Sequence, residues 1–451
     1  MTTAAPDTLA IAAKPARKSA RYAAYVLVIL MMAYMLSFMD RVLITLMIEP
    51  IRTELGLGDT QIGLLVGFGF VLLYSIMGIP FGSMADKSNR RNLMVFGILG
   101  WSAATAASGF AGGFITLLAA RAMVGIGEAT LSPAAYSTIA DRFERKNIGM
   151  AVSIYSMGVS LGGGMAMLCG GFLVSWAMKT HIALPNIDLT GWRLAFVAVG
   201  LLGLPFAALM MFTVREAKRQ QSAKSAPPLK DIFTLALSQK KAFGGVIIGY
   251  SVIVIAAFIP TLWAPVHFGR AFGMAPAQVG LAFGIIIGVF GTFGLFLGGL
   301  LSDMLARRGR YDAQVLIVML SALTQAPLLI AAFLVSDLKL ALGLAAAGMV
   351  CSCMFGGLQA GTLQLLTPAN MRGRMTAIYL LVANIAGMGI GPLLIGFCSE
   401  HLFSGPTSLG QALALITGIS LAIGLTILAL TRTAIAAAIK ANESKELGLT
   451  T

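Results

Sequence analysis

The sequence predicts an all-helical membrane protein with 12 transmembrane helices arranged in two pseudo-symmetric six-helix bundles. Composition is the first observation behind this expectation. Of 451 residues, 58% are hydrophobic and 11% are charged, and the mean hydropathy is +0.87. A soluble protein of this length would carry about a quarter charged residues. The apolar residues gather in long stretches of roughly 20 or more, which at ~1.5 Å rise per residue can cross a bilayer core.

The length and composition of these stretches are the second observation. They are rich in Leu, Ile, Ala, Met and Gly, which excludes the short alternating strands of an outer-membrane barrel. The expected spans are residues 23–48, 61–85, 92–111, 115–140, 148–176, 192–213, 242–266, 277–301, 313–335, 340–366, 375–399 and 411–431.

A short string that occurs twice is the third observation. Residues 82–91 read Gly-Ser-Met-Ala-Asp-Lys-Ser-Asn-Arg-Arg, and residues 299–308 read Gly-Leu-Leu-Ser-Asp-Met-Leu-Ala-Arg-Arg. The shared positions are offset by 217 residues, close to half the chain. Such a period in a membrane protein indicates two tandem bundles, an architecture typical of transporters. The expected divisions are a tail over 1–22, a bundle over 23–214, a linker over 215–241, a bundle over 242–431 and a tail over 432–451.

The distribution of basic residues predicts the orientation in the membrane. Of the 32 Lys and Arg residues, 25 fall on the side that holds both termini and the linker, and 5 fall on the other side. This bias follows the positive-inside rule, so we expect both termini to be cytoplasmic in a bacterial inner (plasma) membrane. The net charge of +14 therefore sets topology and does not indicate a nucleic-acid partner. Residues 1–22 precede a run without a cleavage site, which favours a retained first span over a signal peptide.

Several chemistries lack their sequence signatures. All four cysteines lie in apolar spans, which implies neither a disulfide nor a metal framework. There is no His-Glu-x-x-His string and no phosphate-binding Gly-x-x-x-x-Gly-Lys-Ser/Thr string. A membrane-embedded enzyme is the alternative from another class, but the histidines His181, His267 and His401 fall in outer loops or at span ends. We expect no enzyme, no metal and no cofactor, and a channel is disfavoured because no filter-like loop is visible.

Four charged residues lie inside the expected spans: Asp40 and Arg41 in the first, Arg121 and Glu128 in the fourth. A charge at bilayer depth costs about 2.5–3.5 kcal/mol or more, so each indicates a functional site. Glu128 follows Arg121 by seven residues, two helical turns on the same face, and we expect Arg121 to lie within reach of both carboxylates. Such a set can load or release a proton, which makes Asp40 and Glu128 the expected proton-coupling residues. A buried Asp40–Arg121 pair that only fixes helix register is the alternative.

The second half contributes no intramembrane charge. Its candidate substrate-binding residues are Tyr250, Trp263, Gln359, Tyr379 and Asn384, and for each the favoured alternative is a packing or helix–helix polar contact. A cavity charged on one side and apolar on the other suits an amphipathic substrate better than a sugar. A glycine stripe in the eighth span, which includes Gly280, Gly284 and Gly288, indicates either close helix packing or a sliding face.

The two six-span halves, the basic linker and the doubled Gly-x-x-x-Asp-x-x-x-Arg-Arg string resemble the major facilitator superfamily over nearly the whole chain. This resemblance implies alternating access and a cytoplasmic gate at the doubled string. A loop that only sets topology would explain the arginines but not the repeated Gly–Asp spacing. The implied gate residues are Gly82, Asp86, Arg90, Arg91, Arg142, Asp303, Arg307 and Arg308.

Two local strings are similar to the spinster branch of that superfamily. They are Phe38-Met-Asp-Arg41 and the segment from Arg121 to Asp141, which contains Gly125-Ile-Gly-Glu128 and Ser132-Pro-Ala-Ala-Tyr136. The branch moves lysolipids and sphingosine-phosphate-like amphiphiles, so the resemblance implies a monomeric, proton-coupled transporter with Arg41 and Arg121 in substrate binding. An organic-anion:proton symporter is the alternative, because an Asp-Arg pair in the first span also occurs there.

Overall fold

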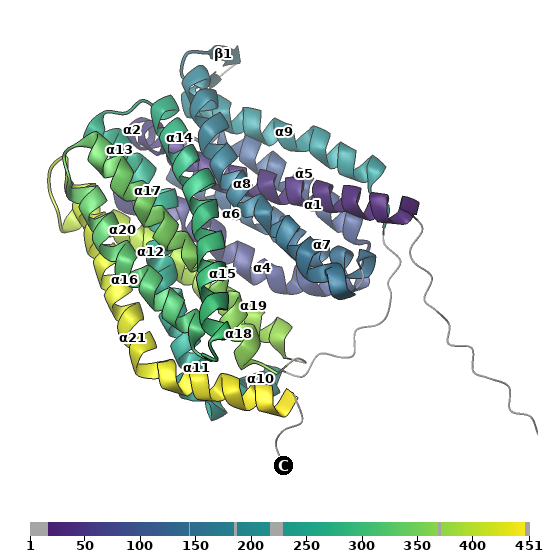
Figure 1. Ribbon diagram of the computed structural model, residues 1–451. Coiled ribbons are helices and arrows are strands. Elements are labelled where there is room, and N and C mark those ends of the chain that lie inside the picture. The colour runs from purple at the N-terminus through teal and green to yellow at the C-terminus, as the bar shows by residue number, and fades with distance from the viewer. Residues whose placement is uncertain (1–16, 144, 185–186, 217–228, 369–370, 447–451) are drawn as a thin grey trace, which may run out of the picture.

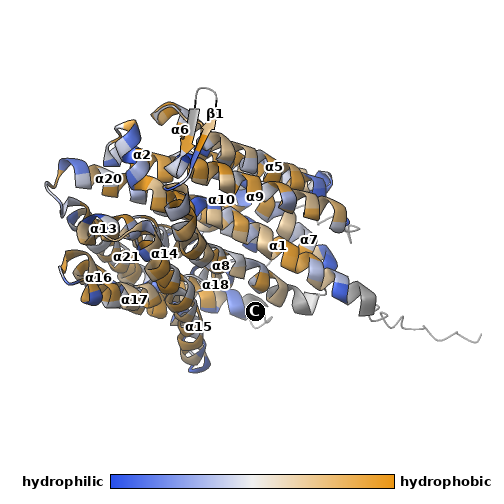
Figure 2. Cartoon of the chain, turned by 90° about the horizontal axis from the view of Figure 1, so that it is seen from above, coloured by the Kyte–Doolittle hydropathy of each residue, from blue (hydrophilic) through white to orange (hydrophobic). Residues whose placement is uncertain are grey.

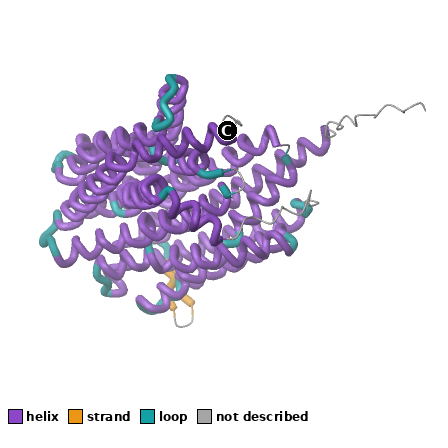
Figure 3. The backbone as a smooth tube through the Cα atoms, turned by 90° about the horizontal axis from the view of Figure 1, so that it is seen from below, coloured by secondary structure: helices purple, strands orange, loops and turns teal. Residues whose placement is uncertain are grey.

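The computed structural model describes residues 17–143, 145–184, 187–216, 229–368 and 371–446 (Figure 1). The described chain is nearly all helical, which confirms the predicted fold class. Its one sheet is the antiparallel pair of β1 (His181–Leu184) and β2 (Ile187–Thr190), which projects from one end of the molecule (Figure 3). We call this the hairpin end. The opposite end, where α1 begins and α21 ends, is the terminal end.

The N-terminal bundle contains six spans, several of them interrupted. The second breaks at Gly67, whose φ of −97° and ψ of −92° are neither helical nor extended. The fourth breaks at Ala129–Thr130, just before Pro133, which has no N–H to continue the helical ladder. The elements are α1 (Arg17–Leu43), the 3-10 helix η1 (Ile44–Met47), α2 (Ile48–Leu55), α3 (Asp59–Val66), α4 (Phe68–Lys87), α5 (Arg90–Ser108), α6 (Phe114–Glu128), α7 (Leu131–Arg142), α8 (Arg145–Ala177) and α9 (Gly191–Thr213).

The C-terminal bundle differs in having three π-helical turns within its spans. Such turns are rare and often occur at functional sites. The linker contributes α10 (Leu229–Ser238). The bundle elements are α11 (Lys240–Gly244), the π-helix η2 (Gly245–Gly249), α12 (Tyr250–Leu262), α13 (Ala264–Phe272), α14 (Pro276–Ile285), the π-helix η3 (Ile286–Gly291), α15 (Thr292–Arg307), α16 (Ala313–Leu334), α17 (Leu338–Met354), α18 (Leu358–Leu366), α19 (Arg372–Asn384), the π-helix η4 (Ile385–Ile390), α20 (Gly391–His401) and α21 (Ser408–Glu446).

Eleven helical stretches of the described chain are long and apolar enough to cross a membrane. The remaining expected span is α5, which begins with Arg90-Arg91-Asn92 and packs against α6 and α9. Its polar first turn lowers its average hydropathy, and its position in the bundle makes it the twelfth helix. Hydrophobic residues follow the helices and hydrophilic residues gather at their ends (Figure 2).

The last helix continues past the predicted end of the bundle at residue 431. The buried side chains of Ile435 and Ile439 pack into the core of the C-terminal bundle, and Asn442 Nδ2 donates to the carbonyl of Leu365 over 2.9 Å. These contacts explain why the segment after residue 431 is helical rather than an extended tail. Residues 1–16 of the predicted N-terminal tail lie outside the described residues.

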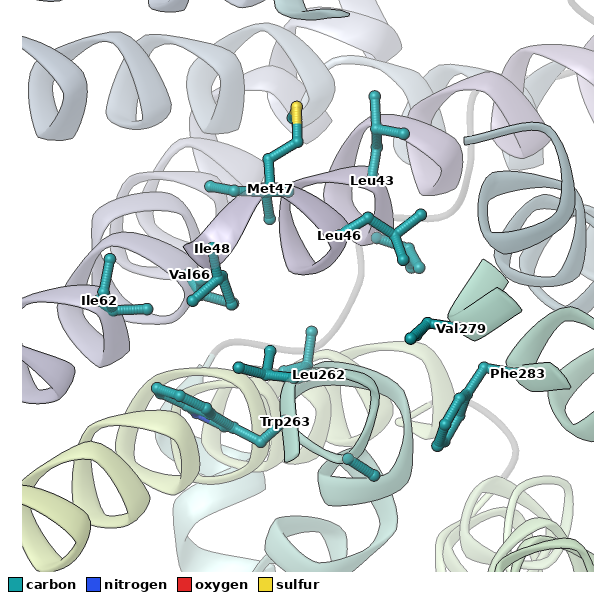
Figure 4. Packing of buried hydrophobic residues seen from close by; sticks show 14 of the residues in the cluster. Leu43, Leu46, Met47, Ile48, Ile62, Val66, Leu262, Trp263, Val279 and Phe283 are labelled. Atoms are coloured by element: carbon teal, nitrogen blue, oxygen red, sulfur yellow. The ribbon is translucent and has the colours of Figure 1, made fainter. Parts of the chain in front are cut away.

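Three hydrophobic cores divide the molecule. One lies in the N-terminal bundle, apart from Met388, and another lies in the C-terminal bundle. The third is shared. In it, residues such as Leu46 and Val66 face Leu262 and Phe283 across the bundles (Figure 4). The shared core includes η1, α2 and α13 at the hairpin end, so the bundles meet there and diverge toward the terminal end (Figure 1).

Glycines allow this close approach. A Cβ on Gly63 of α3 would lie 2.5 Å from the carbonyl oxygen of Pro392, and one on Gly396 of α20 would lie 2.2 Å from that of Asp59. On the other side, a Cβ on Gly171 of α8 would lie 3.1 Å from Cα of Gly280 in α14. The glycine stripe of the eighth span therefore packs against α8 in this structure. Sliding along this face stays a prediction.

Candidate functional site

The four intramembrane charges form two buried ion pairs between α1 and α6. Arg41 Nε lies 2.6 Å from Glu128 Oε2, and Arg121 Nη1 lies 3.6 Å from Asp40 Oδ2. All four side chains are at most 6% exposed. Because consecutive residues on a helix point about 100° apart, Asp40 and Arg41 reach partners that stand two turns apart on α6. The two ion pairs therefore link the first span to the fourth.

This pairing differs from the sequence-based expectation that Arg121 would serve both carboxylates. The seven-residue spacing does put Arg121 and Glu128 on one face, but the Arg41 side chain of α1 lies 2.6 Å from Glu128 and is its ion-pair partner. Each carboxylate thus has its own cation. Removing one arginine would leave one buried carboxylate without its ion-pair partner, which strongly destabilises a fold.

Hydroxyl groups complete each pair. Ser37 Oγ donates to Glu128 Oε2 over 2.5 Å, and Thr105 Oγ1 donates to Asp40 Oδ2 over 2.8 Å. Sequence reasoning missed both residues. Ser37 stands four residues before Arg41, one helical turn away, so helical spacing would have found it. Thr105 comes from α5 and carries no comparable signal.

Aromatic rings surround the Arg41 guanidinium. Its Cζ lies 5.0 Å from the ring centroid of Phe38, 4.6 Å from that of Phe70 and 4.5 Å from that of Tyr74. A cation over an aromatic face is attracted by the ring quadrupole, and the attraction grows when water is excluded. These rings were not anticipated either, because a Phe or Tyr in an apolar span is most often ordinary packing.

Each pair also contains buried polar atoms without a hydrogen-bond partner in the described structure. They are Asp40 Oδ1, Glu128 Oε1, and Nε and Nη1 of Arg121. The site therefore has unused acceptors and unused donors side by side. An anionic group beside Arg121 would accept from nitrogens that make no hydrogen bond within the described structure.

The candidate residues of the C-terminal bundle form neutral contacts instead. Tyr250 and Thr362 share a hydrogen bond of 2.9 Å, and the Tyr379 hydroxyl donates to Gln359 Oε1. Tyr250 and Tyr379 are fully buried and meet edge to face at 6.5 Å. The remaining two candidates are Trp263, buried in the shared core, and Asn384, half-buried before η4.

The two copies of the doubled string lie at the terminal end in different surroundings. In the first copy, the buried Arg90 lies 2.5 Å from Asp141 and 2.7 Å from Glu216, while Arg91 N donates to Glu216 over 3.0 Å. In the second copy, Asp303, Arg307 and Arg308 are exposed. Of the other expected gate residues, Gly82 is half-buried in α4 and Arg142 donates to the carbonyl of Arg215. The side chain of Asp86 lies outside the described residues.

At the hairpin end, an ion network joins the bundles. Both Nη atoms of Arg270 in α13 lie 2.8 Å from the carboxylate oxygens of Asp59, and its Nε bonds Glu49. Thr60 donates from its backbone and hydroxyl to Glu400 over 2.9 and 2.6 Å. Sequence reasoning missed this network, because ordinary short-loop charges give no sign of a partner more than 200 residues away.

Two six-helix bundles that meet at one end, one of them with buried ion pairs inside it, are the architecture of a membrane transporter. Residues 30–392 match the family model of the Major Facilitator Superfamily, and the chain belongs to this family. The predicted superfamily resemblance is thereby confirmed.

Relatives of known name divide among several transport activities. The chain is 28% identical over 386 residues to an MFS-type efflux pump of Mycolicibacterium smegmatis, covering 84% of this chain and 86% of the pump. It is 27% identical over 406 residues to Protein spinster homolog 1 of Homo sapiens, covering 84% and 73%. It is 25% identical over 410 residues to a hexuronate transporter of Bacillus subtilis, covering 88% and 93%.

A solved structure supports the spinster resemblance. The fold is similar to that of a bacterial homologue of the human lysosomal transporter spinster in an inward-facing and occupied conformation, with a TM-score of 0.76 and 27% identity over 93% of this chain and 97% of that one. The predicted likeness to the spinster branch is therefore confirmed in both sequence and structure. The named relatives include an efflux pump, a spinster homologue and a hexuronate transporter, so they do not agree on one class of substrate.

Proposed function

We propose that the protein is a proton-coupled secondary transporter that moves an amphipathic substrate, a lysolipid, a sphingoid-like lipid or a hydrophobic drug-like compound, by alternating access. One observation carries the proposal: the buried Arg41–Glu128 pair, with a second oxygen of Glu128 left without a partner. When Glu128 takes up a proton, it loses its negative charge and Arg41 loses its ion-pair partner. Protonation of Glu128 or Asp40 therefore has a direct structural consequence.

The orientation we propose places the terminal end in the cytoplasm of a bacterial inner membrane. The supporting observation is the excess of Lys and Arg at that end. In this orientation the Arg270 network closes the outer side, and the doubled string stands at the inner opening. The coupling ion is a proton, no further cofactor is required, and the monomer is the transporting unit.

The amphipathic substrate is supported by the contrast between the two bundles. The N-terminal bundle offers charged and aromatic groups, and the C-terminal bundle offers mainly apolar surface with a few neutral hydrogen-bonding groups. A sugar would need many polar partners on both sides. The likeness to proteins named spinster, and to an MFS-type efflux pump, agrees with an amphiphile or a drug-like compound.

Transport in proteoliposomes tests the proposal. The full-length protein is reconstituted in phosphatidylethanolamine–phosphatidylglycerol vesicles, and movement of a fluorescent lysophosphatidylethanolamine is followed with and without a pH gradient. We expect a gradient-dependent rate that Glu128→Gln and Asp40→Asn each reduce more than tenfold. Glu443→Gln, the same chemical change at an exposed site on α21, is the control and should leave the rate unchanged. A Glu128→Gln protein with the wild-type gradient dependence would remove Glu128 from the coupling mechanism.

An organic-anion:proton symporter is the second candidate. It is favoured by the two nitrogens of Arg121 that make no hydrogen bond in the described structure and by the hexuronate transporter among the relatives. The same vesicles separate the candidates if lysolipid and glucuronate are compared. Proton-driven uptake of glucuronate without lysolipid movement would establish the symporter instead.

A further inference from the structure

Phe70 occupies a position that neither the ion pairs nor the gate explains. Its ring centroid lies 4.6 Å from Cζ of Arg41 and 5.7 Å from Cζ of Arg121, so one ring contacts the cations of both pairs. The side chain is 1% exposed and stacks on Tyr74, with 5.3 Å between centroids and 21° between planes. Phe70 is thus the aromatic side chain that both arginines share.

The backbone around Phe70 is built for this placement. A Cβ on Gly125 of α6 would lie 2.4 Å from the carbonyl oxygen of Phe70, so only glycine allows α4 to come this close. Gly125 lies four residues after Arg121 and three before Glu128, between the two charged positions on α6. The close approach of α4 therefore occurs where the ring can reach both guanidinium groups.

The ring and the carboxylate attract Arg41 under different conditions. The ion pair with Glu128 exists only while Glu128 is ionised. The attraction between a cation and a ring face depends on the ring quadrupole and is independent of protonation. When Glu128 takes up a proton, the rings and the Ser37 hydroxyl, to which Arg41 Nη2 donates over 3.4 Å, remain to hold the buried guanidinium in place. The charged and titratable groups around Arg41 are Tyr34 and Asp40 of α1, Tyr74 of α4, Arg121 and Glu128 of α6, and beyond Tyr34 its stacking partner Tyr155 of α8.

We propose that Phe70 is a positioning residue of the site, which keeps Arg41 in place beside Arg121 after Glu128 is neutralised, so that both cations stay ready for one anionic group of the substrate. The inference rests on the proposed function, because it assumes that Glu128 gains and loses a proton during transport. The buried ring also spaces two like charges without adding a charge of its own. Simple core packing by Phe70 is the opposing account, and it predicts no special link to Arg41.

The transport test compares ring loss with ring conservation. In the phosphatidylethanolamine–phosphatidylglycerol vesicles, Phe70→Leu should raise the KM for fluorescent lysophosphatidylethanolamine about tenfold and flatten its pH profile, with little change in the maximal rate. Phe70→Tyr keeps the ring and should restore KM and profile. Phe196→Leu removes another fully buried ring of the same bundle, which packs edge-on against Trp192 at 6.1 Å, and should leave both unchanged.

Two results would overturn the inference. One is a Phe70→Leu protein with the KM and pH profile of Phe196→Leu, and the other is a Phe70→Tyr protein as impaired as Phe70→Leu. Wild-type vesicles without any pH-dependent transport would instead contradict the proposed function. If Phe70→Leu does not fold, Phe70→Met replaces it in every comparison.

A second measurement needs no substrate. In a Glu128→Gln background, which mimics the protonated carboxyl, the melting temperatures of Phe70→Leu, Arg41→Met and the double variant form a double-mutant cycle. We expect the double variant to lose several degrees less than the sum of the two single losses, because each single change already removes the shared contact. Additive losses would overturn the positioning role whatever the substrate is.

Discussion

The two bundles share a fold but divide their chemistry unequally. In both bundles the fourth span breaks midway. The break lies at Ala129–Thr130 in the first half and after Met354 in the second. Glu128 ends the helix before the first break, whereas the neutral Gln359 follows the second break and accepts from Tyr379. The N-terminal bundle thus carries buried ions, and the C-terminal bundle carries π-helical turns and neutral hydrogen bonds.

This difference indicates a division of labour within a duplicated architecture. Buried charges are costly even when paired, so a bundle that holds Asp40, Arg41, Arg121 and Glu128 inside its spans gains a response to protonation at the expense of stability. The C-terminal bundle offers Tyr250, Gln359 and Tyr379 as neutral hydrogen-bonding groups within a mainly apolar surface. The predictions below test how far the contrast extends, starting with the site where it is greatest.

The largest effect should come from breaking the Arg41–Glu128 pair. Arg41→Met leaves Glu128 buried with only Ser37 as a partner, and we expect about 3–5 kcal/mol of lost stability. The double variant Arg41→Met/Glu128→Gln should recover most of this loss, because no uncompensated charge remains. Thermal unfolding in detergent at neutral pH measures both. Equal losses in the single and double variants would show that Arg41 acts through packing and not through its charge.

The next effect concerns the end where the bundles meet. Gly396→Ala puts a methyl group 2.2 Å from the carbonyl oxygen of Asp59, so α20 and α3 must separate or strain. We expect a population with an opened hairpin end, detected as a longer distance between spin labels on Thr53 and Leu402 in a background without the native cysteines. Gly100→Ala, where a Cβ meets nothing within 4 Å, is the matched control. Unchanged label distances in both proteins would show that the Gly396–Asp59 contact adjusts locally without moving the bundles apart.

The sequence predicted much of this architecture, because hydropathy, loop charge and a 217-residue repeat are one-dimensional signals. It also identified Asp40, Arg41, Arg121 and Glu128 as intramembrane charges. The sequence could not predict which ion pairs form, since whether Arg41 or Arg121 meets Glu128 depends on how α1 and α6 are placed within the bundle. The same holds for Phe70, whose role depends on the approach of α4 at Gly125. Linear spacing constrains neighbours on one helix, and contacts between helices need the packed structure.

A smaller effect is expected from the neutral pairs of the C-terminal bundle. The Thr362 hydroxyl already donates to the carbonyl of Leu358 over 2.8 Å, so Tyr250 must be the donor in the hydrogen bond between them. Tyr250→Phe removes one neutral hydrogen bond and leaves only an acceptor unpaired, which costs about 1 kcal/mol. Thermal unfolding beside Arg41→Met gives the comparison. A loss as large as that of Arg41→Met would abolish the contrast between the bundles.

The smallest effect should come from Asp312, which precedes α16 at the terminal end. Arg310 donates to its carboxylate over 3.0 and 3.1 Å, and these bonds lower the pKa of Asp312. A carboxyl whose folded-state pKa is lowered stabilises the fold above its unfolded pKa of about 3.9, and the contribution is lost as pH falls through the folded value. Asp312→Asn should therefore lower the melting temperature slightly at pH 7, corresponding to less than about 1 kcal/mol, and the difference should shrink as pH falls below the unfolded pKa.

The ion pairs of Arg90 in the N-terminal bundle provide a buried comparison for the exposed pair of Arg310 and Asp312. Arg90 is 1% exposed between Asp141 and Glu216, whereas Arg310 is 46% exposed beside Asp312. Solvent screens the exposed pair more strongly, so Asp141→Asn should cost more stability at pH 7 than Asp312→Asn. Equal costs would mean that the burial of Arg90 does not make its ion pair more stabilising than the exposed pair of Arg310 and Asp312. A cost for Asp312→Asn that does not change with pH would show that the loss does not come from the charge of the carboxylate.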